Sequence, residues 1–377
     1  MGAMRRPAPL VVLVGLIALL VLACGSNVVS PSPSDEAATP PPSPGSPAVS
    51  PLPSESPPAS DPPPGAALWT RLSPPGPGPS ARDGHTWTVD PSSGLAYLFG
   101  GRNDKSALGD LWVYDLAADA WRQSHPEGPS PAARFGHVAA WVDGVGLVVF
   151  AGQTGSSSLL GDMWAYDPDA DHWSELRSPG VRPAARTRSC AAVGTDGRIW
   201  ISHGASKGSV DLTDTWAYDP AADRWSVETP KGTLPVARSG HRCWWTADGR
   251  LALYAGETTD GATLDDLWTL GSPGGPGTAW RRTDGSKTIP RSLPAIDGDG
   301  DRIVVVGGVG TGGAYLSDIV TFDAKTLAAS AVAQAGEAPA GRSSAALVDD
   351  PAAERLLLFG GLDGSGALDE LWQLDLP

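Results

Sequence analysis

The segment Asp110-Leu-Trp112-Val-Tyr114-Asp115 decides the fold, because it recurs at a fixed interval along the chain. Close copies start at Asp162 and Asp214, and weaker copies start at Asp266, Asp318 and Glu370. The central tryptophan of the motif is spaced by 52 residues and stands at Trp112, Trp164, Trp216, Trp268 and Trp372, with Val320 in its place in the fifth copy. A period of this length indicates a fold built from one supersecondary unit that is repeated.

Two further features accompany each copy. A glycine pair or its remnant follows an apolar run upstream of the motif, as in Phe99-Gly-Gly101 and Phe359-Gly-Gly361. Further upstream stand Arg82-Asp-Gly-His85, Arg134-Phe-Gly-His137 and Arg238-Ser-Gly-His241. Six copies in this register, over about 310 residues, resemble the kelch repeat of the galactose-oxidase-like β-propellers. The resemblance implies an all-β fold in which each repeat is one four-stranded blade.

The two ends of the repeat region predict how the ring of blades closes. A second tryptophan, placed on the outermost strand, recurs at Trp121, Trp173, Trp225 and Trp280. Counting 52 residues back from Trp121 reaches Trp69, while the last unit ends after its third strand at Pro377. We therefore predict a six-bladed β-propeller over residues 67–377. Residues 68–72 supply the outer strand of the last blade, and this closure removes exposed sheet edges.

The segment before the repeats indicates an exported, lipid-anchored protein. Arg5 and Arg6 precede an apolar run from Leu10 to Ala23, which is shorter than the ~20 residues that span a bilayer, so residues 1–23 are predicted to be a signal peptide. The run ends at Cys24 and resembles a bacterial lipobox, whose cysteine is acylated. An ordinary signal peptide with a chance cysteine is the alternative. We expect an extracytoplasmic protein anchored to the cell membrane as a lipoprotein, with a lipid bilayer as one partner.

Residues 24–66 form a compositionally distinct tether. Among residues 25–66 there are 14 prolines and 10 serines and no aromatic residue, so this stretch cannot bury enough surface to fold. The whole chain carries a formal net charge of -15, which argues against nucleic acid as a partner because phosphates require clustered lysine and arginine.

The arginine at the start of each repeat has two interpretations. A ring of six cations on one face could hold an anionic ligand. An Asp or Glu follows each arginine after 28 or 27 residues, and an inner strand starts at the same end of a blade as the third strand, which favours a repeated structural Arg–carboxylate pair. Arg188 is the best candidate for a free cation, because it stands where three other blades have glycine.

The cysteines Cys190 and Cys243 lie one and two residues after the Gly-His position of their blades. This offset directs them to opposite faces of their strands, and neighbouring blades present opposite faces to each other. We predict a disulfide between blades, which an extracytoplasmic compartment allows. Two small buried thiols are the alternative.

The sequence predicts no metal site and no cofactor. Its six histidines show no metal-ligand spacing; His85, His137 and His241 occupy one repeated position and are expected to be structural. The run Asp297-Gly-Asp299-Gly-Asp301 lacks the glycine and glutamate of an EF-hand loop and is predicted to be a hairpin tip. The copper site of galactose oxidase is not expected here, because no histidine-rich cluster accompanies the cysteines.

A binding platform for a protein or glycan ligand is the favoured function, and an enzyme is the rival class. The resemblance implies that the loops after the glycine pairs and those before the arginines share one face. The ligand-binding candidates on it are Arg102, Asn103, Gln153, Arg188, His203 and Glu257. An enzyme resembling the sialic acid mutarotases or epimerases would need an acid/base pair in the central pocket. A structural subunit of an envelope assembly would instead show a large apolar patch.

Overall fold

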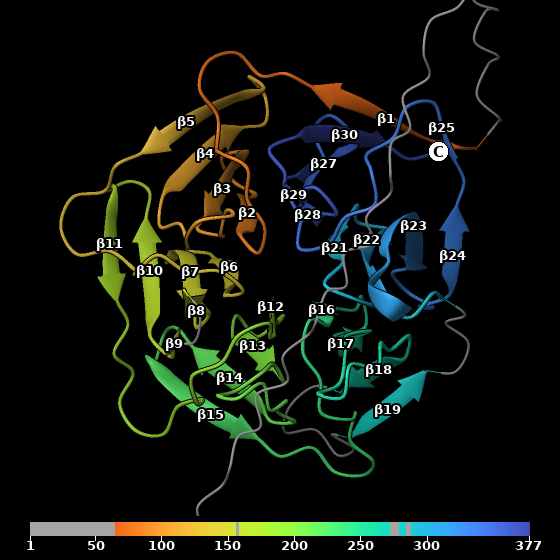
Figure 1. Ribbon diagram of the computed structural model, residues 1–377. Coiled ribbons are helices and arrows are strands. Elements are labelled where there is room, and N and C mark those ends of the chain that lie inside the picture. The colour runs from red at the N-terminus through yellow and green to blue at the C-terminus, as the bar shows by residue number, and fades with distance from the viewer. Residues whose placement is uncertain (1–64, 156–157, 272–278, 284–287) are drawn as a thin grey trace, which may run out of the picture. The chain divides into compact units, whose positions relative to one another are not determined.

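The computed structural model describes residues 65–155, 158–271, 279–283 and 288–377. These residues form six large, mainly antiparallel β-sheets around a central axis (Figure 1), and two further sheets of two short strands each. The predicted signal peptide, Cys24 and residues 24–64 of the tether lie outside the described residues. The described helical structure is a single 3₁₀ turn, η1 (Thr311–Gly313). No helix in this part of the chain has the length and apolarity required to cross a bilayer.

Each sheet is one blade, and its strands follow one another from the axis outward. Blade 1 consists of β2 (Thr86–Asp90), β3 (Leu95–Phe99), β4 (Leu111–Asp115) and β5 (Ala120–Ser124). Blade 2 consists of β6 (Val138–Val142), β7 (Gly146–Phe150), β10 (Met163–Asp167) and β11 (His172–Glu175). Blade 3 consists of β12 (Cys190–Val193), β13 (Ile199–Ser202), β14 (Thr215–Asp219) and β15 (Arg224–Glu228).

The second half of the chain continues the pattern. Blade 4 consists of β16 (Arg242–Trp245), β17 (Leu251–Tyr254), β18 (Leu267–Leu270) and β19 (Trp280–Thr283). Blade 5 consists of β21 (Ala295–Gly298), β22 (Arg302–Gly310), β23 (Tyr315–Asp323) and β24 (Ala329–Val332). Blade 6 consists of β26 (Ala346–Asp350), β27 (Arg355–Phe359), β30 (Leu371–Asp375) and β1 (Ala67–Leu72). Shorter strands are β8 (Gln153–Thr154), β9 (Ser158–Leu159), β20 (Arg291–Ser292), β25 (Gln334–Ala335), β28 (Leu362–Asp363) and β29 (Gly366–Ala367).

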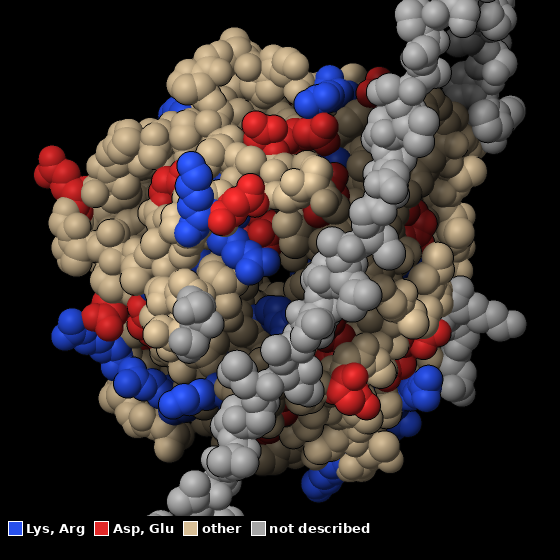
Figure 2. Space-filling view, in the orientation of Figure 1, with Lys and Arg blue, Asp and Glu red and all other residues tan. Residues whose placement is uncertain are grey.

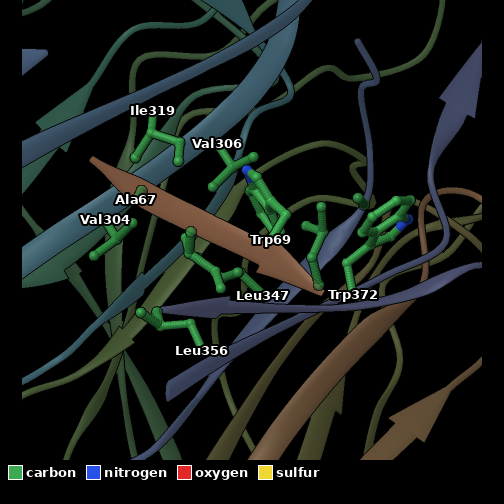
Figure 3. Packing of buried hydrophobic residues seen from close by; sticks show 12 residues of the cluster. Ala67, Trp69, Val304, Val306, Ile319, Leu347, Leu356 and Trp372 are labelled. Atoms are coloured by element: carbon green, nitrogen blue, oxygen red, sulfur yellow. The ribbon is translucent and has the colours of Figure 1, made fainter. Parts of the chain in front are cut away.

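Strand β1 closes the ring as predicted. It pairs antiparallel with β30, so that Trp69 lies opposite Leu374 and Arg71 opposite Trp372. Figure 3 shows Trp69 and Ala67 of this strand packed with apolar side chains of blades 5 and 6. The outer edge of β1 is covered in turn by a short parallel pairing with β25. The fold is therefore a six-bladed propeller whose last blade is completed by the first strand.

The Trp-x-Tyr-Asp motif builds the turn between the third and fourth strands of a blade. In blade 1 the hydroxyl of Tyr114 donates to Asp119 Oδ1 at 2.8 Å, and Asp115 Oδ1 accepts the backbone N–H groups of Ala117 and Ala118, each at 3.0 Å. Such local acceptors favour a tight turn. Blades 2 and 3 repeat the arrangement.

The outer tryptophans fill the seams between blades. Trp173 of blade 2 packs on Phe99 of blade 1 with ring centroids 5.1 Å apart, and Trp121 of blade 1 packs on Phe359 of blade 6 at 5.4 Å. Trp173 is 1% exposed. Burial of one such side chain is worth about 4 kcal/mol at the usual area coefficient, and this explains why the repeat requires tryptophan.

A disulfide joins the innermost strands of blades 3 and 4. It links Cys190 of β12 to Cys243 of β16, with a Cα–Cα distance of 5.6 Å. The pairing predicted from strand parity is therefore present, in place of two free thiols. The predicted hairpin tip is also present, since Asp299 N–H donates to the Arg302 carbonyl between β21 and β22.

Candidate functional site

Every blade contains the buried Arg–carboxylate pair. Nη1 and Nη2 of Arg82 donate to the two carboxylate oxygens of Asp110, both at 2.8 Å, and Nη1 also donates to the Gly100 carbonyl at 3.0 Å. Trp112 Nε1 donates to the same carboxylate at 2.7 Å. Burial raises the pKa of Asp110, but the hydrogen bonds and charge of Arg82 outweigh it and hold this pKa below its ordinary value. The equivalent pairs are Arg134–Asp162, Arg186–Asp214, Arg238–Asp266, Arg291–Asp318 and Arg342–Glu370.

These pairs confirm the structural interpretation of the repeated arginines. The six guanidinium groups are at most 2% exposed, and each is neutralised within its own blade. They are not available to a ligand. Ligand binding on this face must therefore rely on residues that depart from the repeat.

A closed ring of backbone hydrogen bonds links the blades on the same face, which we call the upper face. In each blade the residue at the glycine position of the Gly-His motif donates its N–H to the carbonyl of the equivalent residue in the preceding blade, at 2.7–2.9 Å. The ring passes through Gly84, Gly136, Arg188, Gly240, Leu293 and Ser344. All six residues have φ between 54° and 67°.

The left-handed conformation of the ring favours glycine, but three blades place another residue there. Arg188, Leu293 and Ser344 each adopt it at a cost of roughly 1 kcal/mol. Their side chains line a pocket at the centre of the upper face. These three residues therefore bring side chains to the axis at positions where the other three blades have only hydrogen.

The pocket, which we call the upper pocket, has a volume of about 450 Å³. Its walls are ring residues and the loops that follow the glycine pairs, and its charged lining residues are Asp83, Arg102, Arg188, Lys207 and Arg242. Four cationic side chains thus face one carboxylate in a protein of net charge -15. Figure 2 shows lysine or arginine surface inside the central hollow of the face in view.

Arg188 is paired rather than free, which corrects the sequence prediction. Its Nη1 donates to Glu257 Oε1 at 2.5 Å, across the boundary between blades 3 and 4. Glu257 Oε2 also accepts the hydroxyl of Ser292 at 3.2 Å. Glu257 therefore stands behind Arg188 and orients it. Because both side chains remain about 30% exposed, the pair keeps access to solvent.

Arg102 and Arg242 are held in different ways. Arg102 Nε donates to the Asp83 carboxylate at 3.0 Å, and its guanidinium lies 4.8 Å from the centroid of the Phe135 ring. Arg242 has carbonyl acceptors only: Nε donates to the Pro294 carbonyl at 2.7 Å, and Nη1 donates to the His241 carbonyl at 3.2 Å. Burial lowers the pKa of Arg242 to about 10, which leaves it charged at neutral pH. Among the described residues no carboxylate pairs with it.

Two histidines of the repeat also reach the upper pocket, His85 and His137. Burial, followed by the charge of Arg82, lowers the pKa of His85 to about 3, and burial also lowers that of His137. Both imidazoles are therefore neutral at physiological pH, and His137 Nε2 lies 2.9 Å from Thr86 Oγ1. General acid–base catalysis favours groups that titrate near the working pH, so these histidines suit hydrogen bonding better than proton transfer.

Of the six predicted ligand-binding residues, Arg102, Gln153 and Arg188 line the upper pocket, and Glu257 orients one of them. Asn103 does not line it, because its Oδ1 accepts the N–H groups of Lys105 and Ser106 and so closes its own loop.

His203 is also absent from the lining and is fully buried. It occupies the first position of the glycine pair, where a side chain is directed at the next blade. Its ring accordingly lies 5.5 Å from that of His241 and 6.4 Å from that of Trp280, both in blade 4.

Two of the cations that line the pocket, Arg242 and Lys207, were not among the residues predicted from the sequence. Arg242 directly follows the Gly-His motif of blade 4, where the other blades carry Thr86, Val138, Cys190, Ala295 and Ala346. A charged residue at the start of an apolar inner strand was the available signal. No group of three or more His, Cys, Asp or Glu among the described residues could hold a metal ion.

Comparison with known proteins agrees with the blade geometry. Residues 65–256 and 224–377 match the KLHDC2/KLHL20/DRC7 Kelch-repeats domain. The chain belongs to the kelch-repeat family. The match begins where the described propeller begins, so it covers the six blades and does not reach Cys24.

Several curated proteins are similar to part of the chain. The human multiple epidermal growth factor-like domains protein 8 is 32% identical over 199 residues, which are 51% of this chain and 7% of that protein. The Arabidopsis thaliana serine/threonine-protein phosphatase BSL2 is 29% identical over 68% of this chain and 27% of its own length. The Xenopus laevis Rab9 effector protein with kelch motifs is 28% identical over 46% of this chain and 50% of its own length. The kelch-repeat chain thus matches half or less of the length of these relatives.

Proposed function

We propose that this kelch propeller is a protein-binding platform that holds an acidic segment of its partner in the upper pocket. The observation that carries the proposal is the half-buried guanidinium of Arg242, which has no carboxylate partner among the described residues and stands at the wall of a pocket whose other cations are Arg102, Arg188 and Lys207. A carboxylate of the partner would give Arg242 the anion it lacks, and charge-assisted hydrogen bonds of this kind are the strong ones.

The family supports a protein as the partner rather than a small substrate. The relative named as a Rab9 effector protein with kelch motifs has a protein partner in its name. The two neutral histidines in the pocket do not favour proton transfer at physiological pH. A glycan ligand remains an outcome that the experiment below distinguishes.

The second part of the proposal is that the chain is exported and anchored through an acylated Cys24, with residues 24–66 as the tether. Its support is the charged and apolar pattern of residues 1–23 and the disulfide between Cys190 and Cys243, which an oxidising compartment permits. Replacement of Cys24 by Ser is expected to move the protein from the detergent phase to the aqueous phase in a phase-partition assay. Unchanged partitioning would refute the anchor.

The test of the binding proposal uses the whole chain with acidic and neutral peptide arrays and with arrays of sialylated and neutral glycans. Arg242→Ala should weaken binding of the retained acidic peptides by roughly 10- to 100-fold, because a hydrogen bond between charged groups contributes about 1.5–3 kcal/mol. Arg281→Ala, on the exposed face of outer strand β19, is the matched control and should change affinity less than twofold.

Three results would overturn the proposal. The first is a failure of the native chain to retain any acidic peptide, and the second is equal binding by the Arg242→Ala and native chains. The third is selective retention of glycans, which would assign the pocket to sugars. Circular dichroism of both variants establishes that each is folded before binding is compared.

A further inference from the structure

A chain of pockets runs along the propeller axis, and its two ends differ in charge. The upper pocket shares lining residues with a pocket around Trp87 and Cys243, that pocket shares lining with a third, and the third shares Val89, Asp297 and Gly298 with a fourth. This fourth pocket lies at the opposite end of the inner strands, which we call the lower face. Its volume is about 890 Å³.

The wall of this lower pocket is largely apolar. It is formed by the turns that join β2 to β3, β4 to β5 and β26 to β27, and it includes Val89, Pro91, Leu116, Pro351 and Ala352. None of these residues lines the upper pocket. The two pockets could therefore be occupied at the same time.

The charges of the lower pocket are four carboxylates and one cation. Arg355 is already satisfied: Nη2 lies 2.7 Å from Asp119 Oδ1, Nε lies 2.9 Å from Asp350 Oδ2, and Nη2 also donates to a main-chain carbonyl at 2.9 Å. Asp297 and Asp349 remain without a cation. No Lys or Arg of the described residues lies within ion-pair distance of either carboxylate.

The main chain of Asp349 contacts the carboxylate of Asp297 across the boundary between blades 5 and 6. The Asp349 N–H donates to Asp297 Oδ2 at 2.9 Å, and the Gly298 N–H donates to Asp297 Oδ1 at 2.8 Å. The described residues provide no hydrogen-bond donor to the carboxylate of Asp349. Arg302 Nη2 lies 2.7 Å from Asp299 Oδ2. This nearby arginine is therefore already paired and does not neutralise Asp297 or Asp349.

Both carboxylates titrate near neutral pH. Burial raises the pKa of Asp297 to about 6, and burial together with the charge of Asp297 raises the pKa of Asp349 to about 7. A metal ion is not the expected occupant, because both oxygens of Asp297 already accept main-chain N–H groups and the described residues form no metal-binding group. A single positive charge carried on an apolar stem complements the pocket better.

We propose that the lower pocket is a second binding site, which accepts a lysine side chain of a partner protein. The ammonium group lies between the carboxylates of Asp297 and Asp349, and the methylene groups pack on Val89, Pro91 and Leu116. The propeller then binds an acidic segment at one end of its axis and a basic residue at the other.

The test is a titration of the whole chain at pH 8 with the peptide acetyl-Gly-Leu-Lys-Leu-Gly-amide, followed by calorimetry. The double variant Asp297→Asn/Asp349→Asn should bind at least 10-fold more weakly, since it removes both anions and keeps the shape of the side chains. The matched control Asp143→Asn makes the same chemical change in the exposed turn between β6 and β7 and should bind within twofold of the native chain. The Arg242→Ala variant should bind this peptide normally, which separates failure of this site from failure of the upper pocket.

Chemical and pH controls complete the experiment. The peptide with an acetylated lysine should not bind, and binding of the unmodified peptide should weaken at pH 5, where protonation of the two carboxylates removes the attraction. The proposal is refuted by the absence of saturable binding at millimolar peptide, by equal binding of the double variant, or by equal binding of the acetylated peptide.

Discussion

Removal of the disulfide between Cys190 and Cys243 should destabilise the propeller by an amount that follows from the length of chain it encloses. The two residues are 53 positions apart in sequence. The chain-entropy relation for a loop of this size gives about 4 kcal/mol at 25 °C, because the bond restricts the unfolded chain more than the folded one. The variant to compare with the native protein is Cys190→Ala/Cys243→Ala.

The measurement is urea unfolding of the oxidised native protein and of this double variant, with and without a thiol reductant. We expect the free energy of unfolding to fall by about 4 kcal/mol in the variant. For a propeller of this size that change corresponds to a drop in Tm of about 6 °C. The variant itself should not respond to reductant, whereas the native protein should approach the variant once reductant is added.

Two results would refute this reasoning. One is an unchanged free energy of unfolding in the double variant. The other is a native protein that keeps its stability after mass spectrometry has shown both thiols reduced. Either result would mean that strand pairing within blades 3 and 4 already restricts the 53-residue segment in the unfolded ensemble.

Three further predictions concern single residues. Asp162→Asn leaves the fully buried Arg134 without its anion and should cost about 3–5 kcal/mol in urea unfolding. Gly146→Ala places a methyl group against the Tyr166 carbonyl at a positive φ and should lower Tm by several degrees, whereas Gly144→Ala, at a positive φ with open space around it, should cost only about 1 kcal/mol. Asp297→Asn should remove the fall in stability that ionisation of this carboxyl causes between about pH 4 and about pH 6. The variant should itself cost about 1–3 kcal/mol, because its amide nitrogen cannot accept one of the two main-chain N–H groups that the native carboxylate binds. The folded pKa of Asp297 is raised to about 6 from 3.8, so the folded state binds the proton more tightly and native stability falls as pH rises between these values, as thermal melts across that range will test.

The propeller fold could be predicted because its determinants are local and repeated six times. The spacing of the tryptophans fixed the number of blades, and the position of Trp69 relative to Trp121 indicated the closing strand. The Arg–carboxylate pairs could be predicted for the same reason, since their spacing of 28 residues persists from blade to blade.

The candidate site was only partly predictable, because it consists of the residues that break the repeat. Substitution of Arg188 for the usual glycine was visible in the sequence, but its ion pair with Glu257 depends on how two blades are offset. His203 also interrupts a glycine pair, yet at that position the side chain enters the seam with the next blade and not the pocket. The direction of a side chain at a left-handed residue cannot be read from repeat spacing alone.

The offset that brings the two cysteines together also brings together a pair of aspartates. Cys190 and Cys243 are offset by one residue relative to the repeat, and they meet across a blade boundary. Asp297 and Asp349 stand three and four residues after the same reference position and meet across the next boundary but one. The cysteine pair with this offset forms a disulfide, and the aspartate pair is joined by a hydrogen bond. Two ionised acids that lie close together without a cation raise the free energy of the folded state. The repeat pairs its six repeated arginines within their blades, whereas Asp297 and Asp349 at the lower end of the axis and Arg242 at its upper end have no ion pair among the described residues. A partner of opposite charge can add favourable energy at both ends. Binding is therefore expected at the two ends of the axis and not on the outer strands.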